Sequence, residues 1–431
     1  MLADQAAALS RYLRQEIAAH SPYYRSILAP MVGQLTALKG RSELTALPFT
    51  TLDQAGALDP SALVLRPDRS SIRAGGDLKL VARLSRQRVI GREWKLALDI
   101  VDPLYKPVLW TIEAGLLVGS SSADLTRLAD LGRRALEAGG VRPSDVLVSL
   151  LPPGPTIAST ELCLGARLAG IPTLSLDPSS DDALPDRLAQ LVPSVLAGRS
   201  TDLERLFLRA RREGVTLDAV RVVIVVGDEA PLDERGLIQL QSLLGAGTEV
   251  VVFWAPPGVR SLWTQCVGGT GLHVWPEAEA IEVIDPVDGF SVTGMGVGEV
   301  VWTGIGWRGT ALVRLRTGWD GHLEETTCPT CGRETPRLRL EPAVRVDPAH
   351  RGLAAILDEH PDIEEWQAEL RTVGNRDELL VFLAPGAGHA LDRLLLDLER
   401  EVSATQYVIV DRASLATRRI VHGDQPVLDR R

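Results

Sequence analysis

The stretch Val222-Val223-Ile224-Val225-Val226-Gly227 consists of five β-branched apolar residues followed by a glycine. A strand that is apolar at every position is buried on both faces, which is typical of parallel sheets with helices on either side. A similar run, Val146-Leu147-Val148, comes shortly before Pro152-Pro153-Gly154 and follows a predicted helix over 124–138. Such alternation of apolar strands with helices predicts an α/β fold.

The pattern changes near residue 280, where shorter alternating strands are predicted at 281–284 and 298–302, with a turn at 285–289 between them. A last unit begins near Pro342. It contains predicted strands at 379–383 and 407–410 and, between them, an amphipathic helix with Leu391, Leu394, Leu395, Leu398 and Val402 on one face. We therefore predict a large α/β domain over 1–341, with a β-rich part at about 260–341, and a small α+β domain over 342–431.

The chain has 431 residues, of which 45% are apolar and 24% charged, as in ordinary globular proteins. Its net charge of -10 and its lack of a basic run argue against nucleic-acid partners. An amphipathic pattern at the start (Leu2, Leu9, Leu13, Ile17) carries charges throughout, unlike a signal peptide, and no apolar run reaches the roughly 18 residues of a membrane span. We expect a cytoplasmic protein without membrane partners.

The clearest chemical signal is Cys328-Pro-Thr-Cys331-Gly-Arg. Two thiolates two residues apart on a tight turn can both bind one Zn²⁺, and the following glycine lets the backbone fold over the metal. Cys266 and His273, around the glycine-rich stretch 268–271, are the candidates for the other half of the site. The four residues would form a closed Cys₃His set without an open position for substrate.

Two alternatives remain for these residues: a redox-active Cys-x-x-Cys pair, or unrelated thiols and a surface histidine. The fourth thiol, Cys163, lies in an apolar segment and is predicted to be a buried core residue. Four cysteines in so long a chain fit metal chemistry in a reducing compartment better than a disulfide framework.

The segments around the knuckle form an ordered series: 271–275, 282–286, 298–303, 313–318 and then the Cys-Gly-Arg sequence. In order and spacing they resemble the phenylacetate-CoA ligases, which belong to the adenylate-forming superfamily. Weaker pieces at 21–25, 47–51, 124–145, 165–172 and 226–231 follow the same order. The resemblance implies a large N-terminal domain of two α/β sheets and a β-rich part, followed by a mobile C-terminal lid. It also implies activation of a carboxylic acid with ATP and Mg²⁺, followed by acyl transfer to CoA.

The family's phosphate loop is rich in Ser, Thr and Gly, whose hydroxyls and amides surround the triphosphate. By spacing from Asp124 it falls near 108–116, where Glu113 would place a carboxylate against the phosphates. The nearby run Ser120-Ser121-Ser122 is predicted to cap the helix that contains Asp124. A weaker candidate phosphate site is the Ser- and Gly-containing stretch 70–79, which is acidic and out of order.

The other ATP-binding positions also depart from the family. In the stretch 253–258 a proline replaces the magnesium-binding glutamate, and Trp319 stands at the position of the ribose-binding aspartate. Asp320, one residue later, is either a substitute ribose ligand or a solvated turn residue. The lid lysine is missing, because the chain's few lysines are Lys39, Lys79, Lys95 and Lys106. Arg418, Arg419 and His422 lie near its place and are predicted to be surface groups.

We interpret the sequence as a phenylacetate-CoA ligase-like protein with impaired ATP-dependent adenylation, which binds an acyl or aryl ligand, a small carboxylate, acyl-CoA or a protein partner. Structural zinc is the favoured cofactor, ATP with Mg²⁺ and CoA stay open, and no catalytic residue is assigned. The candidate cofactor-binding residues are Gly227, Asp228, Glu229 and Asp320, with a ligand site between the first three and the 254–263 loop.

Four tryptophans, Trp254, Trp263, Trp302 and Trp307, either line an apolar ligand pocket there or pack in the core. One alternative function is a divergent, active acyl- or aryl-CoA ligase that forms an acyl-adenylate and then a CoA thioester. Another is acyl transfer from preformed acyl-CoA, with His422 or Asp320 as the base.

Overall fold

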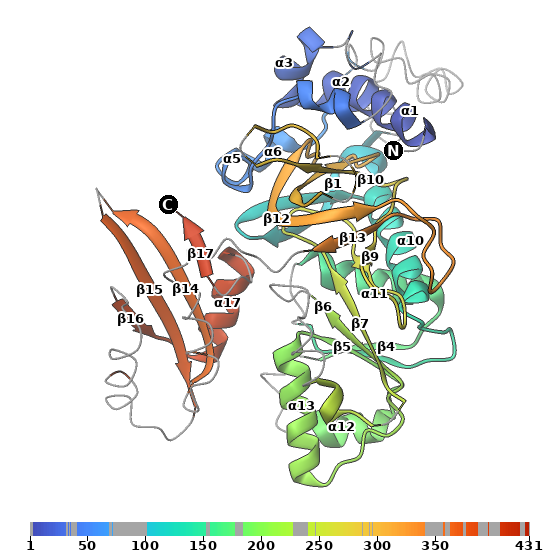
Figure 1. The fold of residues 1–431 in the computed structure, drawn as a ribbon, viewed down its shortest axis with the longest axis vertical. Coiled ribbons are helices and arrows are strands. Elements are labelled where there is room, and N and C mark those ends of the chain that lie inside the picture. Colours follow the sequence, from blue (N-terminus) through green and yellow to red (C-terminus); the bar gives the residue numbers. More distant parts are fainter. Residues whose placement is uncertain are drawn as a thin grey trace.

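The computed structural model is shown in Figure 1. It describes residues 3–31, 33, 35, 41–68, 71, 101–151, 156–176, 184–226, 240–245, 247–286, 288–292, 294, 296–340, 357, 363–373, 376–386, 395, 406–422 and 427–430. The predicted domain boundary at 341–342 lies outside these residues. No helix among them is both long enough and apolar enough to cross a membrane.

Parallel strands form the α/β part, as the apolar runs predict. The strands are β3 (Leu147–Ser149), β4 (Thr173–Ser175), β5 (Val195–Gly198), β6 (Val222–Val226) and β7 (Glu249–Trp254). They lie side by side in the order β7-β6-β5-β3-β4, all parallel. The five residues of β6 are all buried, which confirms the prediction for this stretch.

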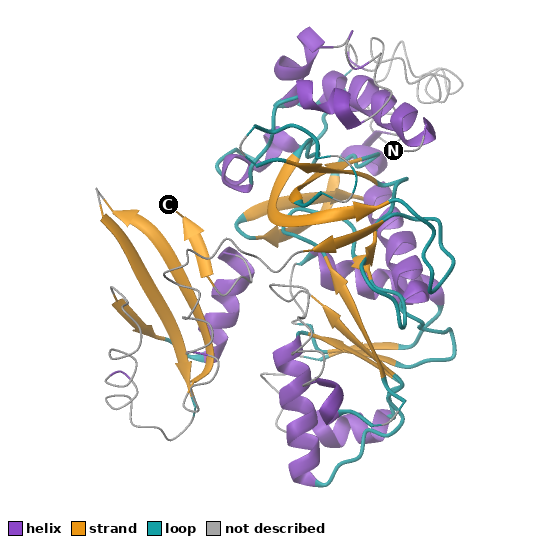
Figure 2. Ribbon diagram, in the orientation of Figure 1, coloured by secondary structure: helices purple, strands orange, loops and turns teal. Residues whose placement is uncertain are grey.

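Helices cover both faces of these strands (Figure 2). Helices α10 (Ser122–Ala138) and α11 (Ile157–Ala169) share a core with Val222, Ile224 and Val226, whereas α12 (Leu184–Leu191) and α13 (Ser200–Glu213) share one with Val223 and Val225. Because side chains alternate along a strand, each face needs its own apolar cover. This arrangement explains why β6 is apolar at every position.

Helices α10 and α11 begin and pack as their sequences require. Ser121 caps α10 by accepting a hydrogen bond from the Asp124 backbone N–H, and the Asp124 carboxylate accepts one from Ser121 N–H, so the predicted cap is confirmed. The helices meet at Gly132 and Gly165, where an added Cβ would lie 2.3 Å from backbone atoms of the other helix. Close approach of the two helices therefore depends on these glycines.

The β-rich part continues the same sheet instead of forming a separate one. Its strands are β8 (Trp263–Thr264), β9 (Leu272–His273), β10 (Glu279–Ile284), β11 (Gly298–Gly304), β12 (Leu315–Glu324) and β13 (Arg337–Leu340). The antiparallel hairpin of β10 and β11 confirms the prediction for 281–284 and 298–302. Strand β8 pairs with β7, and the result is one eleven-stranded sheet. Thus the described residues do not show two separate α/β sheets.

The N-terminal segment is helical, and Leu9, Leu13 and Ile17 are completely buried, as their spacing predicts. Its elements are α1 (Ala3–Tyr12), the π-helix η1 (Leu13–Ile17), α2 (Ala18–His20), α3 (Tyr24–Leu28), the 3₁₀ turns η2 (Ala29–Met31) and η3 (Arg41–Ala46), α5 (Leu52–Gly56) and α6 (Pro60–Leu63). A two-stranded hairpin, β1 (Pro107–Glu113) and β2 (Leu116–Ser121), leads into α10.

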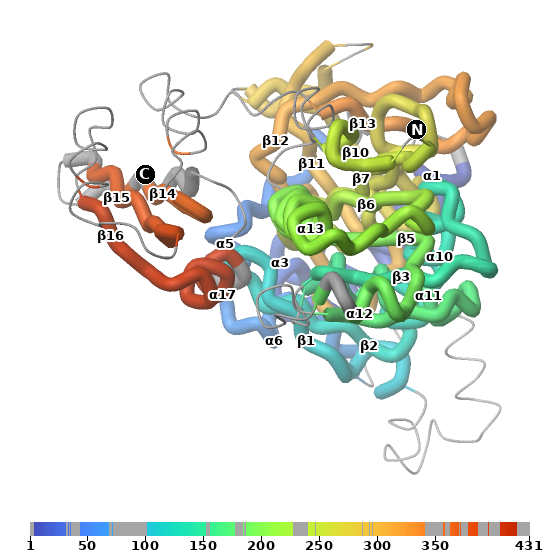
Figure 3. The backbone as a smooth tube through the Cα atoms, turned by 90° about the horizontal axis from the view of Figure 1, so that it is seen from below, coloured from blue at the N-terminus to red at the C-terminus, as the bar shows by residue number. Residues whose placement is uncertain are grey.

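The C-terminal unit has a four-stranded sheet in the order β16-β15-β14-β17. Its elements are β14 (Ile363–Val373), β15 (Arg376–Pro385), β16 (Gln406–Ile409), α17 (Arg412–His422) and β17 (Val427–Arg430). The strands predicted at 379–383 and 407–410 are confirmed. Of the predicted helix between them, only Leu395 is described, and it is helical. The sheet stands beside the main body with α17 on the side that faces it (Figures 1 and 3).

Three predictions about individual side chains are wrong. Arg418 and Arg419 are not surface groups: Arg418 hydrogen-bonds to Glu369 and lies 3.7 Å from the centre of the Phe382 ring, and Arg419 donates to the Trp366 carbonyl at 2.8 Å. The side chain of His422 lies outside the described residues. Cys163 is not fully buried, and its sulfur lies 3.4 Å from the Ser175 hydroxyl at the partly exposed side of α11.

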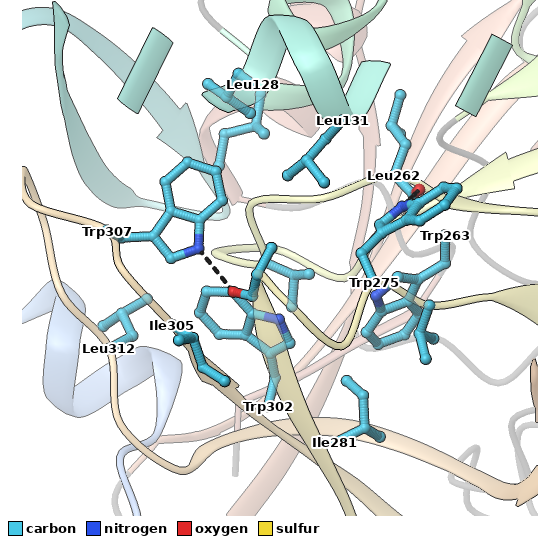
Figure 4. Packing of buried hydrophobic residues seen from close by; sticks show 14 of the residues in the cluster. Leu128, Leu131, Leu262, Trp263, Trp275, Ile281, Trp302, Ile305, Trp307 and Leu312 are labelled. Atoms are coloured by element: carbon cyan, nitrogen blue, oxygen red, sulfur yellow. Dashed lines mark hydrogen bonds between the residues drawn. The ribbon is translucent and has the colours of Figure 1, made fainter. Parts of the chain in front are cut away.

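The four tryptophans predicted either to line a pocket or to pack in the core belong to the core. Trp254, Trp263, Trp302 and Trp307 are at most 3% exposed. Figure 4 shows the last three among leucine and isoleucine side chains from α10 and the β-rich part. The Trp263 and Trp302 indoles both donate to the buried Glu279 carboxylate. They are therefore committed to packing and internal hydrogen bonds.

Candidate metal centre

Four side chains that can bind a metal come together in the β-rich part. Each of Cys266, His273, Cys328 and Cys331 contributes one ligand atom, and these atoms all lie within 4.8 Å of one another. The sulfurs of Cys266 and Cys328 are 3.8 Å apart, and the Cys331 sulfur is 3.4 Å from His273 Nε2. Only Cys331 is partly exposed. Three sulfurs and one imidazole nitrogen at such spacing match a closed tetrahedral zinc site.

The sheet brings the two halves of the cluster together. His273 lies on β9 between two paired strands, opposite Thr264 of β8 on one side and Arg337 of β13 on the other. Cys266 follows β8, and the Cys328–Cys331 turn precedes β13. Because β9 pairs with both strands, residues about 60 positions apart in sequence meet beside β9, in the interior of the strand order.

Glycines allow both turns to close around the cluster. A Cβ at position 269 would lie 2.3 Å from the Cys266 sulfur, so only glycine fits there without moving the ligand atom. In the knuckle, Gly332 has a φ of +72° and donates from its N–H to the Cys328 carbonyl at 2.9 Å. This left-handed residue is the glycine that was predicted to let the backbone fold over a metal.

His273 is held in the form that a metal ligand requires. Burial, together with the nearby Arg333 and Arg337, lowers the pKa of His273 to about 4, so the imidazole is neutral at pH 7. Its Nδ1 lies 2.8 Å from the Thr335 hydroxyl. When Nδ1 donates its proton to Thr335, Nε2 presents a lone pair toward Cys331.

The thiols of the cluster influence one another. Burial and hydrogen bonds with the other two thiols raise the pKa of Cys266 to about 12. Burial also raises that of Cys328, but backbone N–H groups of the knuckle outweigh it and lower the pKa of Cys328 to about 7. Three thiols so close together favour a shared cation, since a metal removes the mutual repulsion of thiolates.

The β1–β2 hairpin occupies the position where the resemblance puts the phosphate loop. Its turn consists of Ala114 and Gly115, with φ values of +48° and +84°, and its strands pair directly on either side. The Glu113 carboxylate accepts a hydrogen bond of 2.5 Å from the backbone N–H of Ile157, the first residue of α11. A helix N-terminus attracts anions, and here a carboxylate of the chain itself takes that role.

No protein-family model matches the chain. The phenylacetate-coenzyme A ligase of Thermus thermophilus is 25% identical over 226 residues, which make up 52% of this chain and 50% of that ligase. The match thus spans about half the length of this curated relative.

Solved structures match over nearly the whole chain. A 2-hydroxyisobutyryl-CoA ligase in the postadenylation state with R3-HIB-AMP gives a TM-score of 0.63 at 18% identity, covering 99% of this chain and 89% of that one. The chain thus has the fold of this ligase, and about half of it is similar in sequence to a phenylacetate-coenzyme A ligase. The same ligase with 2-HIB-AMP and CoA in the thioesterification state gives 0.61 at 17% identity, with the same coverage.

Within this fold, Asp320 does not take the place of Trp319. Buried and partly exposed residues alternate along β12; Trp319 is 3% exposed and packs on Trp254, with the ring centres 5.0 Å apart. Asp320 lies on the opposite face of β12, in register with Glu299 of β11. Its role in binding a ribose stays a prediction, as do those of Gly227, Asp228 and Glu229, which lie outside the described residues.

The acyl-transfer alternative needs a nucleophile and a base. Among the described residues, His20 Nδ1 lies 3.0 Å from the Ser71 hydroxyl. Both side chains are buried, and the hydroxyl also accepts from Asp68 N–H and donates to its carbonyl. This geometry is that of a turn, and it gives no support to a reactive serine.

Sequence reasoning missed Thr335 and Glu161. Thr335 contacts His273 only because β13 pairs with β9, and no local pattern indicates that register. Glu161 lies in the middle of apolar α11 and is completely buried; its carboxylate accepts from Leu262 N–H at 3.0 Å. A charged residue on an otherwise apolar helix face was the one available signal for it.

Proposed function

We propose that this chain is a phenylacetate-CoA ligase-like protein that holds a structural zinc ion and binds an acyl or aryl ligand without adenylating it. The ligand would be a small carboxylate or an acyl-CoA. The observation that carries the proposal is the β1–β2 hairpin, in which a two-residue turn and the Glu113 carboxylate stand where the family has its phosphate loop.

The residues of the hairpin do not fit a triphosphate. A phosphate loop surrounds its ligand with several backbone N–H groups, whereas a two-residue turn between paired strands leaves few of them unpaired. A phosphate placed near the first turn of α11 would also meet the negative charge of Glu113. We therefore derive no reaction step that uses ATP.

The missing lid lysine supports the same conclusion. The sequence has no lysine after Lys106, so no alignment of the C-terminal unit supplies one. Arg418 and Arg419, which lie near its expected place, are bound to Glu369 and to the Trp366 carbonyl. Loss of even one group that stabilises a transition state typically lowers the rate by about 10²–10³.

The zinc assignment is supported by the donor set and by its surroundings. Three thiols and a neutral imidazole are the ligands that Zn²⁺ prefers in structural sites, and the Thr335 hydroxyl fixes the orientation of the imidazole. A dithiol redox pair would not need the third cysteine and the histidine within 4.8 Å. Thiols kept for zinc also fit the reducing cytoplasm that we expect for this chain.

The test is calorimetric titration of the purified protein, first with ATP and Mg²⁺ and then with an acyl-CoA such as phenylacetyl-CoA. Pyrophosphate exchange is measured in parallel with a panel of carboxylic acids. We expect no ATP binding, no exchange, and binding of acyl-CoA or of a free acid. Exchange above background would overturn the proposal and establish the alternative, a divergent ligase that forms an acyl-adenylate and then a CoA thioester.

A further inference from the structure

The metal cluster lies where the strands of the eleven-stranded sheet are shortest. Strands β8 and β9, of two residues each, join the parallel strands to the antiparallel ones, and we call these two strands the junction. Thr264 pairs with Phe253 of β7 on one side and with His273 of β9 on the other. The next link is the pairing of β9 with β13. His273 is therefore both a residue of the junction and one of the four candidate ligands.

Such short strand pairing makes the junction dependent on the cluster. Cys266 follows β8 and the Cys328–Cys331 turn precedes β13, so a shared ion connects the segments on either side of β9. The binding free energy of a structural metal is also folding free energy. The ion thus adds stability at the place where the strands pair over the fewest residues. This dependence rests on the zinc site of the proposed function.

Cys331 is the ligand that solvent reaches. Its side chain is partly exposed, whereas Cys266, His273 and Cys328 are buried. Oxidation of a thiol requires access as well as thiolate character, so a dissolved oxidant meets Cys331 first. A second thiol is close to it, because Cys328 belongs to the same turn and the ligand atoms of the cluster all lie within 4.8 Å of one another.

We propose that the cluster is a redox switch, in which hydrogen peroxide oxidises Cys331, Cys328 forms a disulfide with it, and the junction loosens because both sulfurs cease to be ligands. The Cys331 sulfur attacks one peroxide oxygen, the O–O bond breaks, and a sulfenic acid and water form. The Cys328 sulfur then attacks the Cys331 sulfur, the S–O bond breaks, and a second water leaves. The two thiols lose two electrons and two protons, which the peroxide takes up.

The geometry favours Cys328 over Cys266 as the second thiol. Cys328 and Cys331 belong to one turn, so a bond between their sulfurs needs movement within that turn alone. The Cys266 sulfur is confined by its own loop, since a Cβ at position 269 would lie 2.3 Å from it. After the disulfide forms, Cys266 and His273 alone do not complete a tetrahedral site. A dithiol reductant returns two electrons and two protons and restores the ligands.

The first test treats the purified, zinc-containing protein with hydrogen peroxide and follows zinc release with a chromophoric indicator. Trypsin cleaves after Arg316 and Arg333, so Cys328 and Cys331 fall in one peptide and Cys266 in another. We expect loss of about one zinc ion per chain, in step with a 317–333 peptide that has lost two hydrogens. Dithiothreitol with zinc should reverse both changes. Zinc release without this disulfide, or with one that links Cys266 to the 317–333 peptide, would overturn the proposal.

Cys331→His is the matched variant, because it keeps four zinc ligands but removes the exposed thiol. It should bind zinc and retain it in peroxide. Cys163→Ser, which removes the partly exposed thiol outside the cluster, should release zinc as the wild type does. If Cys331→His releases zinc at the wild-type rate, oxidation does not begin at Cys331 and the proposal fails. Should this variant bind no zinc, the peptide analysis of the wild type decides.

Hydrogen exchange measured by mass spectrometry reports on the junction itself. After zinc release the amides of 261–275 should exchange faster, whereas those of β6, which is buried at every position, should keep their rates. Unchanged exchange at 261–275 would mean that the junction holds without the ion, and the switch would be wrong. A protein that keeps its zinc in peroxide contradicts the switch alone, whereas a protein purified without zinc contradicts the proposed zinc site as well.

Discussion

Two turns of the main body differ in what their polar side chains do. The Cys328–Cys331 knuckle points two sulfurs toward Cys266 and His273, and these atoms have the spacing of a metal's ligands. The β1–β2 hairpin points Glu113 at the N-terminus of α11, where the carboxylate satisfies a backbone N–H of the chain itself. The first turn is arranged for a ligand from outside; the second is closed by the protein's own groups.

Helix α11 connects these two regions. Its first N–H is bound by Glu113 of the hairpin, and one turn later Glu161 accepts from Leu262 N–H, four residues before Cys266. The same helix therefore holds both the carboxylate of the hairpin and the segment that leads to Cys266.

The largest effect is expected when the knuckle loses its sulfurs. The wild-type chain should contain about one zinc ion, and Cys328→Ser with Cys331→Ser should remove it, because two of four ligands are lost. Metal binding is coupled to folding, so stability should fall by on the order of 5 kcal/mol. Elemental analysis and thermal unfolding measure both quantities.

Cys163→Ser is the matched control for these substitutions. Its sulfur contacts Ser175 and takes no part in the cluster, so the zinc content should stay at the wild-type level. If the wild-type protein contained no zinc and the double variant were as stable as the wild type, the knuckle would not be a metal site. The proposed difference between the two turns would then be wrong.

Glu161, between the two regions, should make stability depend on pH. Burial, and the nearby Glu279 carboxylate, raise the pKa of Glu161 to about 8, against 4.5 for an unperturbed glutamate. Between these values the unfolded chain has released the proton and the folded chain retains it. Stability from this group therefore falls by about 1.4 kcal/mol per pH unit, or about 3 kcal/mol from pH 4.5 to 7.

Glu161→Gln has the shape of the protonated acid and should remove this slope. Urea unfolding at several pH values from 5 to 8 would then show the variant gaining on the wild type as the pH rises. The same change at Glu137, which is 64% exposed on the neighbouring helix α10, serves as the control. If the stabilities of Glu161→Gln and of the wild type changed with pH in parallel, the pKa of the Glu161 carboxyl would not be raised by folding, and the prediction would be wrong.

The parts of the fold that depend on local sequence patterns could be predicted. Strand β6 and the cap at Ser121 follow from five consecutive apolar residues and from a serine three residues before an aspartate. The cluster was predictable from residue types, although its two halves meet only through the pairing of β9 with β8 and β13.

The wrong predictions concern side chains and strands whose contacts are made with distant parts of the sequence. The partners of Arg418 and Arg419 lie on β14, about 50 residues earlier in the chain, and no pattern in α17 indicates them. The sheet is continuous because Phe253 of β7 pairs with Thr264 of β8. Strand β7 is parallel to β6, whereas β8 is antiparallel to β7, so no single sequence pattern covers both strands. An apolar sequence around Cys163 likewise does not tell which face of α11 turns outward.

Thr335→Val should weaken the metal cluster without changing its ligands. The variant keeps the shape of the side chain but removes the oxygen that accepts from His273 Nδ1. Loss of such a partner typically lowers metal affinity by about 10–100-fold. Competition with a chromophoric chelator measures this affinity, and Thr335→Ser, which retains the hydroxyl, should remain near the wild type. Equal affinities for the Val and Ser variants would show that His273 needs no orienting group.

Glu113→Gln tests whether charge or backbone shape closes the hairpin to phosphate. The amide keeps an oxygen for the Ile157 N–H but loses the favourable interaction of a carboxylate with the N-terminus of α11, so stability should fall by about 0.3–1 kcal/mol. We expect no thermal shift with ATP and Mg²⁺, because the two-residue turn at Ala114 and Gly115 remains. If ATP stabilised this variant but not the wild type, the negative charge of Glu113, and not the shape of the turn, would be what prevents the hairpin from binding ATP.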